Sequence, residues 1–568
     1  MSEKLKSIAD SIKQAKPVEA KENKFLPSKC PVIPLGTKKG MYYYIDALGQ
    51  FRELKDKDHG RTILLGLLGS DVAFCKREYP KKNADGGVNG WKPDEFGKDL
   101  MAECACRGVW EPFERVRGAG VWIDDDDQIV IHSGDVIIKN NVYTNPGVCG
   151  AYVYPSEPAR QRPWDNEVRP EEFGEFYALL KTWAWRRPEI DPMLLLGWIG
   201  AASIGGALKW RPLMWLSGDR GTGKSTLQEV INFVFNKSIL SVSDPTPAAI
   251  FQKIGFSSLP VALDEMEPEA DSKRVQSIIK LARQACSGGV ILRGSAEGNA
   301  SEFKARNCYL FSSILVPALL PQDRSRMAIL ELDRITGTPP RIKRNELAVI
   351  GSKILRRMID KFDDFYTNIE MLRAGFSNLG FDSRGCDQFG TLIAAAQVLL
   401  FDYPMTSDDV QEMCESMRDV IEAEKFDNDA NHIQCRDHLL TSILDTYKDG
   451  RKRSIGDWIA QAAGRDNTNK NEDADNAHKT LAAIGIKVED EIIAGEKTKC
   501  LLIATKHQGL AKIYKETDWA GGVWTQAFRR FKNAAAFNTR RFGGVASKCT
   551  IIPLDEILGK ENENGQNL

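Results

Sequence analysis

Gly218-Asp-Arg-Gly-Thr-Gly-Lys-Ser225 is the stretch of this 568-residue sequence that decides the fold. It matches the pattern G-x-x-x-x-G-K-S, and it lies between the apolar run 213–217 and the helix-like segment 226–234. Glycines at 218, 221 and 223 allow a tight turn whose N–H groups point at phosphate oxygens. The stretch therefore predicts a phosphate loop that joins a buried strand to a helix.

This loop predicts ATP and Mg²⁺ as ligands. Lys224 supplies a positive charge to the β and γ phosphates, and the Ser225 hydroxyl can coordinate Mg²⁺. The residues expected to contact ATP are Gly218, Asp219, Arg220, Gly221, Thr222, Gly223, Lys224, Ser225 and Thr226.

Two consecutive acids end the next apolar run, Val261-Ala-Leu-Asp-Glu265. At the end of a strand beside the loop, Asp264 would position Mg²⁺ through its water shell. Glu265 would orient and deprotonate the attacking water, which favours hydrolysis over phosphoryl transfer to a small molecule.

Further along the chain, Gly-flanked residues 287–298 predict a hairpin, and residues 307–315 and 327–332 predict two more strands. Ser312 and Ser313 are placed to bring a hydroxyl beside the γ-phosphate. Arg324 and Arg326 lie on a polar loop, where an arginine can stabilise the charge that develops on a neighbouring subunit's γ-phosphate. A solvated loop is the alternative interpretation of these two arginines.

The order of these motifs resembles the AAA+ helicase module of phage and prophage replication proteins, related to superfamily 3 and to the helicase half of primase-helicases. The resemblance is clearest over residues 190–335. It implies a ring, commonly a hexamer, with ATP at subunit interfaces and DNA in the central channel. It also implies that Ser312 or Ser313 is the first sensor, although superfamily 3 usually has Asn there, and that Arg293 on the hairpin touches the DNA backbone.

The predicted fold class is α/β and multidomain. A central P-loop AAA+ parallel-sheet ATPase is expected between a mixed α+β amino-terminal domain and a helical, winged-helix-like carboxy-terminal region. The expected boundaries are a flexible arm at 1–24, the amino-terminal domain at 25–165, a helical collar with the ATPase core at 166–335, a helical domain at 336–430, a winged-helix-like region at 431–558 and a disordered tail at 559–568.

Charge limits the kinds of partner. With 77 Lys plus Arg against 78 Asp plus Glu, the formal net charge is −1. This balance excludes a protein whose whole surface is basic. Residues 521–550 contain no acid, and their basic groups are expected to neutralise DNA phosphates while their phenylalanines fill a core. The expected DNA contacts there are Arg529, Arg530, Lys532, Arg540 and Arg541.

Other motifs are interpreted as structural. The twelve cysteines form no paired framework and predict free thiols. His432, Cys435 and His438 lack a fourth metal ligand and are expected on a helix, and Asp124 to Asp127 are expected at a hairpin tip rather than in a two-metal site. The apolar run 193–208 is shorter than the roughly 20 residues that span a bilayer, and it predicts a buried helix.

The leading hypothesis is an ATP-driven DNA helicase or translocase that acts in the replication of a phage or another mobile element. It would be located in the cytoplasm, of the host if phage-encoded, because the charged start lacks a secretory apolar stretch. DNA, single-stranded or forked, and a separate primase or other replication proteins are the expected partners, since residues 1–160 show no primase constellation. The alternatives are an ATP-dependent initiator or assembly switch that binds DNA without unwinding it, and a P-loop kinase.

Overall fold

The computed structural model describes residues 23–267, 273–294, 300–317, 319–335, 343–444, 452–465, 472–493, 495–517 and 519–559. The chain divides into two compact units, Met1–Ile421 and Glu422–Leu568, each of which is described by itself. The expected arm at 1–24 and the expected tail at 559–568 lie almost wholly outside the described residues.

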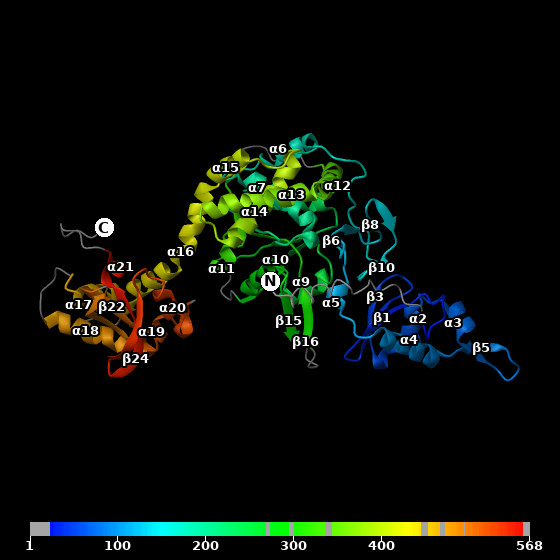
Figure 1. Cartoon of the computed structure of the whole chain (residues 1–568), viewed down its shortest axis with the longest axis horizontal. Coiled ribbons are helices and arrows are strands. Elements are labelled where there is room, and N and C mark those ends of the chain that lie inside the picture. Colours follow the sequence, from blue (N-terminus) through cyan, green and yellow to red (C-terminus); the bar gives the residue numbers. More distant parts are fainter. Residues whose placement is uncertain are drawn as a thin grey trace, which may run out of the picture. The chain divides into compact units, whose positions relative to one another are not determined.

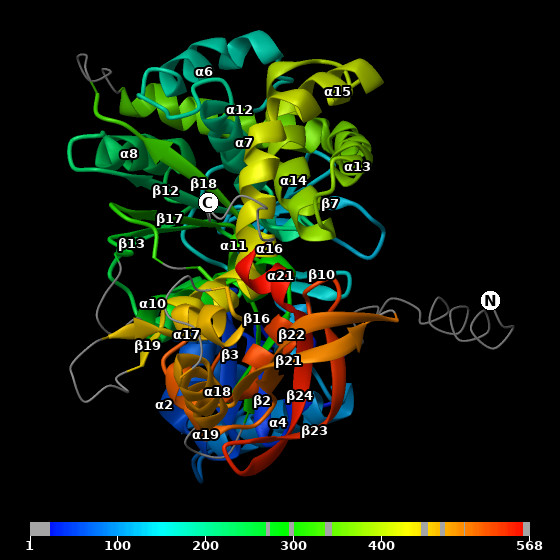
Figure 2. The same ribbon diagram turned by 90° about the vertical axis from the view of Figure 1, so that its left-hand side faces the viewer.

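A five-stranded parallel sheet forms the centre of the first unit, in the order β13-β14-β17-β12-β18 (Figure 2). Its strand β12 pairs in parallel with β17 on one side and β18 on the other. β12 is buried along its whole apolar run, as a strand covered on both faces must be. The bounds are β12 Leu213–Gly218, β13 Leu240–Ser243, β14 Val261–Asp264, β17 Tyr309–Ser313 and β18 Met327–Leu332.

Helices cover both faces of this sheet. Leu227, Val230, Ile231 and Val234 of α8 (Lys224–Phe235) pack with Met214 and Leu216 against one face. On the other face, α9 (Pro247–Ile254) and α10 (Lys273–Cys286) pack against Trp215 and Phe311. Alternate residues of each strand thus face different cores, and the predicted multidomain α/β architecture is confirmed.

A layer of helices packs beyond α8. The buried helix α7 contacts α14, and α14 contacts α13 (Figure 1). The Gln388 side chain of α14 accepts a hydrogen bond from Leu213 N at 3.2 Å and donates one to Leu213 O at 2.6 Å, which ties this layer to the start of β12. The helices of this part are η2 Pro170–Phe173, α6 Gly174–Leu180, α7 Asp191–Ser203, η3 Gly205–Ala207, α11 Pro321–Arg324, α12 Arg344–Asp360, α13 Phe362–Asn378, α14 Ser383–Leu400 and α15 Ser407–Ser416. Helix α16, Arg418–Thr441, begins in the first unit and lies mostly in the second.

The amino-terminal part of the first unit mixes small antiparallel sheets with helices. Strands β1-β2-β3 form one sheet and β6-β7-β8-β9 another, while β4-β5 and β10-β11 are hairpins. The bounds are β1 Ile33–Lys38, β2 Met41–Ile45, β3 Phe51–Lys55, η1 Asp56–Asp58, α2 Arg61–Leu67, α3 Val72–Glu78, β4 Pro80–Lys82, β5 Val88–Trp91, α4 Pro93–Arg107, α5 Pro112–Arg115, β6 Gly120–Ile123, β7 Ile129–His132, β8 Ile137–Lys139, β9 Val142–Thr144, β10 Gly147–Cys149 and β11 Tyr152–Tyr154.

The acidic stretch at 124–127 is the turn between β6 and β7, as expected. Asp124 accepts hydrogen bonds from Gln128 N at 2.9 Å and Asp126 N at 3.0 Å, and it pairs with Lys139. These hydrogen bonds and the Lys139 ammonium outweigh desolvation and lower the pKa of Asp124. The turn is therefore stabilised by its own backbone.

A hairpin forms after α10, but it extends beyond the predicted residues 287–298. Strand β15 (Val290–Gly294) pairs antiparallel with β16 (Ala300–Lys304), which lies outside the predicted range. Arg293 lies on β15 opposite Ser301. The tip at 295–299 lies outside the described residues.

The second unit contains a four-stranded antiparallel sheet in the order β21-β22-β24-β23. The Gly543-Gly544 turn joins β23 to β24. The bounds are β19 Ile443–Leu444, β20 Arg453–Ser454, α17 Ile455–Ala462, α18 Glu472–Ile484, β21 Ile486–Ile493, β22 Glu496–Ala504, α19 Gln508–Ile513, η4 Ala520–Gly522, α20 Trp524–Phe528, β23 Ala535–Phe542, β24 Val545–Pro553 and α21 Leu554–Leu558.

Two helices of this unit have ends set by local sequence. Helix α20 ends at Phe528, because the chain tightens into turns with hydrogen bonds from Arg530 N to Ala527 O and from Ala534 N to Phe531 O, both 3.0 Å. Helix α18 starts at Glu472, where acidic residues suit a helix amino terminus.

All twelve cysteines are free thiols, as predicted. Cys435 and His438 lie on α16, where His438 Nε2 contacts Ile513 O at 3.0 Å. Within the described ranges no group of three or more His, Cys, Asp or Glu residues could hold a metal ion.

Candidate nucleotide site

The glycine-rich loop connects β12 to α8, in the strand, loop and helix order that the motif requires. Gly221 and Gly223 have φ angles of 84° and 82°, which L side chains rarely adopt. A Cβ on Gly223 would lie 2.6 Å from Ile335 Cδ1 and 2.9 Å from Trp183 Nε1. Glycine at 223 is therefore required both by the backbone angle and by the packing around it.

Lys224 folds back onto the loop. Its ammonium donates hydrogen bonds to the carbonyl of Gly218 and to that of Asp219 at 3.1 Å. Burial lowers the pKa of Lys224, and the nearby carboxylates of Glu267, Asp264 and Asp219 act against that shift. The ammonium is thus held where the loop N–H groups and the strand-end acids meet.

A cavity of about 800 Å³ opens at this edge of the sheet, a size suited to a nucleotide-sized ligand. It brings together most of the predicted site: the whole stretch 219–226, both acids at the end of β14, and one of the two serines. Its lining residues are Asp219, Arg220, Gly221, Thr222, Gly223, Lys224, Ser225, Thr226, Asp244, Asp264, Glu265, Glu267, Ser313 and Ile314.

The acids of β14 differ in exposure. Asp264, the last residue of the strand, is half-buried, whereas Glu265 is exposed and has a φ angle of 57°. Asp264 Oδ1 accepts a hydrogen bond from Glu265 N at 2.9 Å. This turn projects Glu265 out of the strand direction at the mouth of the cavity.

The two serines of β17 point to opposite faces of the sheet, because consecutive side chains alternate along a strand. Ser313 lines the cavity, but its hydroxyl donates to Leu315 O at 2.7 Å and accepts from Trp215 Nε1 at 2.8 Å. Ser312 does not line the cavity, and its buried hydroxyl has no hydrogen-bond partner among the described residues. Neither hydroxyl is therefore directed freely at the cavity in this conformation.

Two acids of the site were not predicted. Glu267 accepts hydrogen bonds from Ile314 N at 2.6 Å and Leu315 N at 3.4 Å, so it ties the β14 end to the segment after β17. Asp244 follows β13 and pairs with Arg274. Glu267 could have been found from its place three residues after Asp264. Asp244 could not, because the strand it follows, β13, is short and half-exposed and has no distinct pattern.

Arg324 and Arg326 lie at the opposite edge of the sheet from the loop. They precede Met327, which pairs in parallel with Leu213 at the start of β12. The Arg326 side chain donates a hydrogen bond to Gln322 O. Burial lowers the pKa of Arg326, and the positive charge of the nearby Arg384 lowers it as well. The structure thus does not bring these arginines into the cavity of their own chain.

The residues expected to contact DNA are not among those that line the cavity. The side chain of Arg293 lies outside the described residues. In the second unit, four of the five predicted basic contacts are exposed, namely Arg529, Arg530, Lys532 and Arg541. Arg540 instead pairs with Glu491 at 3.0 Å.

The phenylalanines of this basic region were predicted to fill a core. Phe528, Phe531 and Phe542 do so. The side chain of Phe537 lies outside the described residues.

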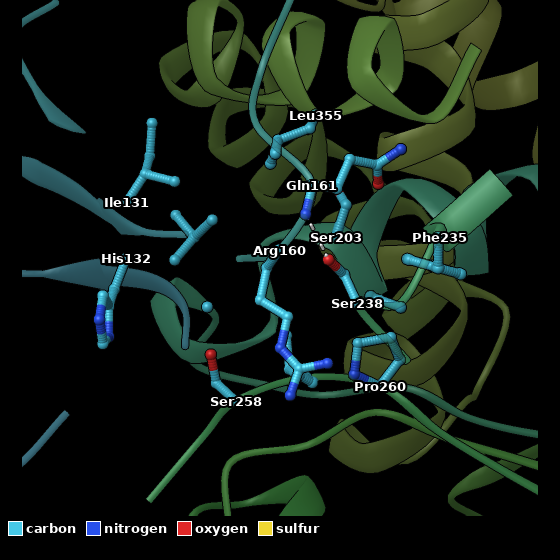
Figure 3. Close-up of a pocket in the computed structure, with 14 residues that line it drawn as sticks. Ile131, His132, Arg160, Gln161, Ser203, Phe235, Ser238, Ser258, Pro260 and Leu355 are labelled. Carbon is cyan, nitrogen blue, oxygen red and sulfur yellow. Dashed lines mark hydrogen bonds between the residues drawn. The ribbon is translucent and has the colours of Figure 1, made fainter. Parts of the chain in front are cut away.

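A second cavity, of about 30 Å³, is enclosed between β6, β7 and the segment before β14, and it has room for about one water molecule. Figure 3 shows His132, Arg160 and Ser258 around it, with the hydrogen bond from Gln161 N to Ser238 Oγ at 2.9 Å. The Ser258 hydroxyl has no partner among the described residues. This cavity is too small for a nucleotide.

No family model matches the chain, and no curated protein matches it. Solved structures of the NrS-1 C-terminal region are similar to it at low level. One apo structure has a TM-score of 0.36 and 10% identity, covering 93% of this chain and 100% of the other. An apo A-form structure has a TM-score of 0.35 and 11% identity, covering 92% and 97%. None of the described helices is long and apolar enough to cross a membrane.

Proposed function

We propose that this protein is an ATP-dependent DNA helicase or translocase that acts in the replication of a phage or another mobile element. In this proposal it is an AAA+ ATPase that hydrolyses ATP with Mg²⁺ at sites shared between the subunits of a ring. The resemblance implies that this ring is a hexamer. The single observation that carries the proposal is the cavity where the loop, Lys224 and the strand-end acids meet.

The residues of the cavity suit ATP and Mg²⁺. Backbone N–H groups of the loop and the Lys224 ammonium are donors for the phosphates. The Ser225 hydroxyl and the Asp264 carboxylate are oxygen ligands of the kind that Mg²⁺ prefers. Since no described cluster could hold a metal alone, the remaining ligands would be water and the phosphates of the nucleotide.

Hydrolysis, rather than transfer to a second substrate, is supported by Glu265. Its carboxylate is exposed and lines the cavity next to Asp264. A carboxylate at that place can accept a proton from a water molecule and orient it for attack. Bound Mg²⁺ would neutralise charge on the phosphates.

Sharing of the site between subunits is supported by the position of Arg324 and Arg326. β12 and β18 run in parallel and in register from Leu213 and Met327 to Gly218 and Leu332. At about 3.3 Å per residue the arginine loop is therefore roughly 17 Å along the sheet from the phosphate loop. An arginine so placed can reach the γ-phosphate bound by a neighbouring copy but not the one in its own cavity.

DNA binding is supported by basic residues in two places, Arg293 on the hairpin β15-β16 and the exposed residues Arg529, Arg530, Lys532 and Arg541. Exposed arginines and lysines bind phosphates and release counterions. In this proposal these basic residues contact DNA phosphates.

Mixing of inactive variants tests the shared site. Lys224→Ala should abolish ATP hydrolysis, and Arg324→Ala or Arg326→Ala should abolish it only in assembled rings. When Lys224→Ala protein is titrated with the finger variant, some sites pair an intact loop with an intact arginine, so hydrolysis should return. Absence of recovery at every ratio would contradict interface sites, and Lys181→Ala, an exposed lysine outside the cavity, serves as the control.

A further inference from the structure

A cluster of basic and aromatic side chains joins the amino-terminal part to the root of the hairpin β15-β16. We call it the arginine–aromatic cluster, and it consists of Arg115, Arg117, Trp122, Tyr152, Lys304 and Arg306. Arg115 ends α5, Trp122 lies on β6, Tyr152 on β11 and Lys304 at the end of β16. Arg117 lies between α5 and β6, and Arg306 lies two residues after β16. Helix α5 packs beside β16 (Figure 1).

Two guanidinium groups lie against the aromatic rings. The Arg117 Cζ atom is 3.2 Å from the centroid of the Tyr152 ring and 5.6 Å from that of Trp122. The Arg306 Cζ atom is 5.4 Å from the Trp122 centroid. Trp122 is therefore flanked by two cations, an arrangement in which the rings orient the guanidinium planes.

These cations have few polar partners. Arg117 is only 5% exposed, donates one hydrogen bond to the Tyr154 hydroxyl at 3.2 Å, and has a buried Nε without a partner among the described residues. Among the side chains that the structure describes, which do not include those of residues 290–303, no ion pair joins Arg117, Lys304 or Arg306 to a carboxylate. A guanidinium has five N–H donors, so most of the donor capacity of the cluster is unused.

The neighbouring charges repel one another. Burial, followed by the charges of the nearby Arg211 and Arg117 guanidiniums, lowers the pKa of Arg306 to about 10. Burial and the Arg306 charge also lower the pKa of Lys304, whereas the Glu114 carboxylate acts to raise it. Uncompensated charges of this kind are costly in a fold, and an anion would relieve that cost.

The nearby acids do not neutralise the cluster. Asp125 accepts a hydrogen bond from the Tyr152 hydroxyl. Glu157 accepts one from Ala119 N at 3.3 Å. Glu114 is exposed at the surface of α5.

We propose that the arginine–aromatic cluster binds the phosphodiester backbone of a nucleic-acid strand that passes the root of the hairpin. This inference rests on the proposed function, because it takes DNA as the ligand. Guanidinium groups recognise phosphate through paired N–H donors, and the buried Trp122 ring and the half-buried Tyr152 ring exclude water around them. Lys304 is exposed and Arg306 is partly exposed, so a strand can reach both. The cluster lies about 13 Å along β16 from Ala300, so one strand can contact the hairpin arm and its root together.

Binding of a fluorescent oligo(dT) to the full chain at several salt concentrations tests this proposal. Arg306→Gln and Lys304→Gln should each remove about one phosphate contact, which reduces the slope of log affinity against log salt by about 0.7 and weakens binding about fivefold at ~0.1 M salt. Arg77→Gln is the matched control, since Arg77 is an exposed arginine paired with Glu78 at 2.7 Å. It should change neither the slope nor the affinity.

Thermal stability separates binding from a structural role. Because Arg306 is partly buried beside other cations, Arg306→Gln should keep or raise the melting midpoint of the free protein while it weakens oligo(dT) binding. A lower midpoint with unchanged oligo(dT) binding would overturn the proposal. Competition by inorganic phosphate at equal ionic strength that matches unlabelled oligo(dT) would also overturn it, because the site would then bind a small anion.

The two proposals fail in different ways. If wild-type protein binds oligo(dT) with a salt-dependent affinity that Arg306→Gln and Lys304→Gln leave unchanged, the cluster is not a strand site and the proposed function stands. If wild-type protein does not bind oligo(dT) at all, both are wrong.

Discussion

Alanine substitution at two glycines of the same loop tests the geometry of the nucleotide site. Gly221 and Gly223 have nearly equal φ angles, 84° and 82°, but their surroundings differ. Nothing lies within 4 Å of a Cβ at Gly221, whereas a Cβ at Gly223 would meet Ile335 Cδ1 at 2.6 Å and Trp183 Nε1 at 2.9 Å. The pair therefore separates backbone strain from steric overlap.

The expected magnitudes follow from these two terms. Left-handed backbone costs a side chain about 1–2 kcal/mol, so Gly221→Ala should destabilise by that amount. Gly223→Ala adds an overpacking cost of about 1–3 kcal/mol, because Trp183 must move and its hydrogen bond to Gly223 O, 3.1 Å long, is disturbed. The sums are about 1–2 and about 2–5 kcal/mol.

Calorimetry of the nucleotide-free protein measures the difference. With an unfolding entropy of about 2.1 cal/mol/K per residue, a unit of roughly 400 residues shifts its midpoint by about 1.2 °C per kcal/mol. Gly221→Ala should lower the midpoint by about 1–2 °C and Gly223→Ala by about 2–6 °C. Equal shifts for the two variants would refute the packing that the structure assigns to Gly223.

Three further outcomes are expected. Glu267→Gln weakens the charge-assisted hydrogen bond to Ile314 N, 2.6 Å long, and should cost about 1–3 kcal/mol of stability, measured by the melting midpoint; an unchanged midpoint would contradict the role of Glu267 as a tie. Burial raises the pKa of Asp191 to about 6, so the contribution of Asp191 to stability is present at low pH and is lost as pH rises through 6. The free energy of unfolding of the wild type, relative to that of Asp191→Asn, should therefore fall by about 3 kcal/mol between about pH 4 and 7. A difference that stays constant with pH would refute this. Replacing Arg529, Arg530 and Arg541 with Gln should reduce the slope of log affinity for duplex DNA against log salt by about 2.7. Arg540→Gln alone should change this slope little, because Arg540 is paired with Glu491. Equal changes of slope in the two proteins would contradict this difference.

The central features of the site were predictable because their chemistry restricts both residue type and spacing. The run 213–216 is apolar throughout and leads into the glycine-rich loop, so a buried strand before the loop was the natural interpretation, and β12 confirms it. The acids after 261–263 were predicted to meet the loop because parallel strands end at one edge of a sheet. The cavity contains both of them.

Other features depend on distant parts of the chain. Whether Ser312 or Ser313 faces the cavity is decided by the register of β17 between β14 and β12, which adjacent identical residues do not reveal. The pairing of Arg540 with Glu491 joins residues 49 positions apart. Trp183 packs on the loop at Gly223 from a segment forty positions earlier, with no local signal for that contact.

Strand displacement on a forked DNA duplex tests the central claim most directly. With ATP and Mg²⁺, the wild-type protein should release the labelled strand, and Lys224→Ala and Glu265→Gln should not, while both variants still bind the fork. Release of the strand by Lys224→Ala, or DNA-stimulated ATP hydrolysis by the wild type without any strand release, would contradict the account.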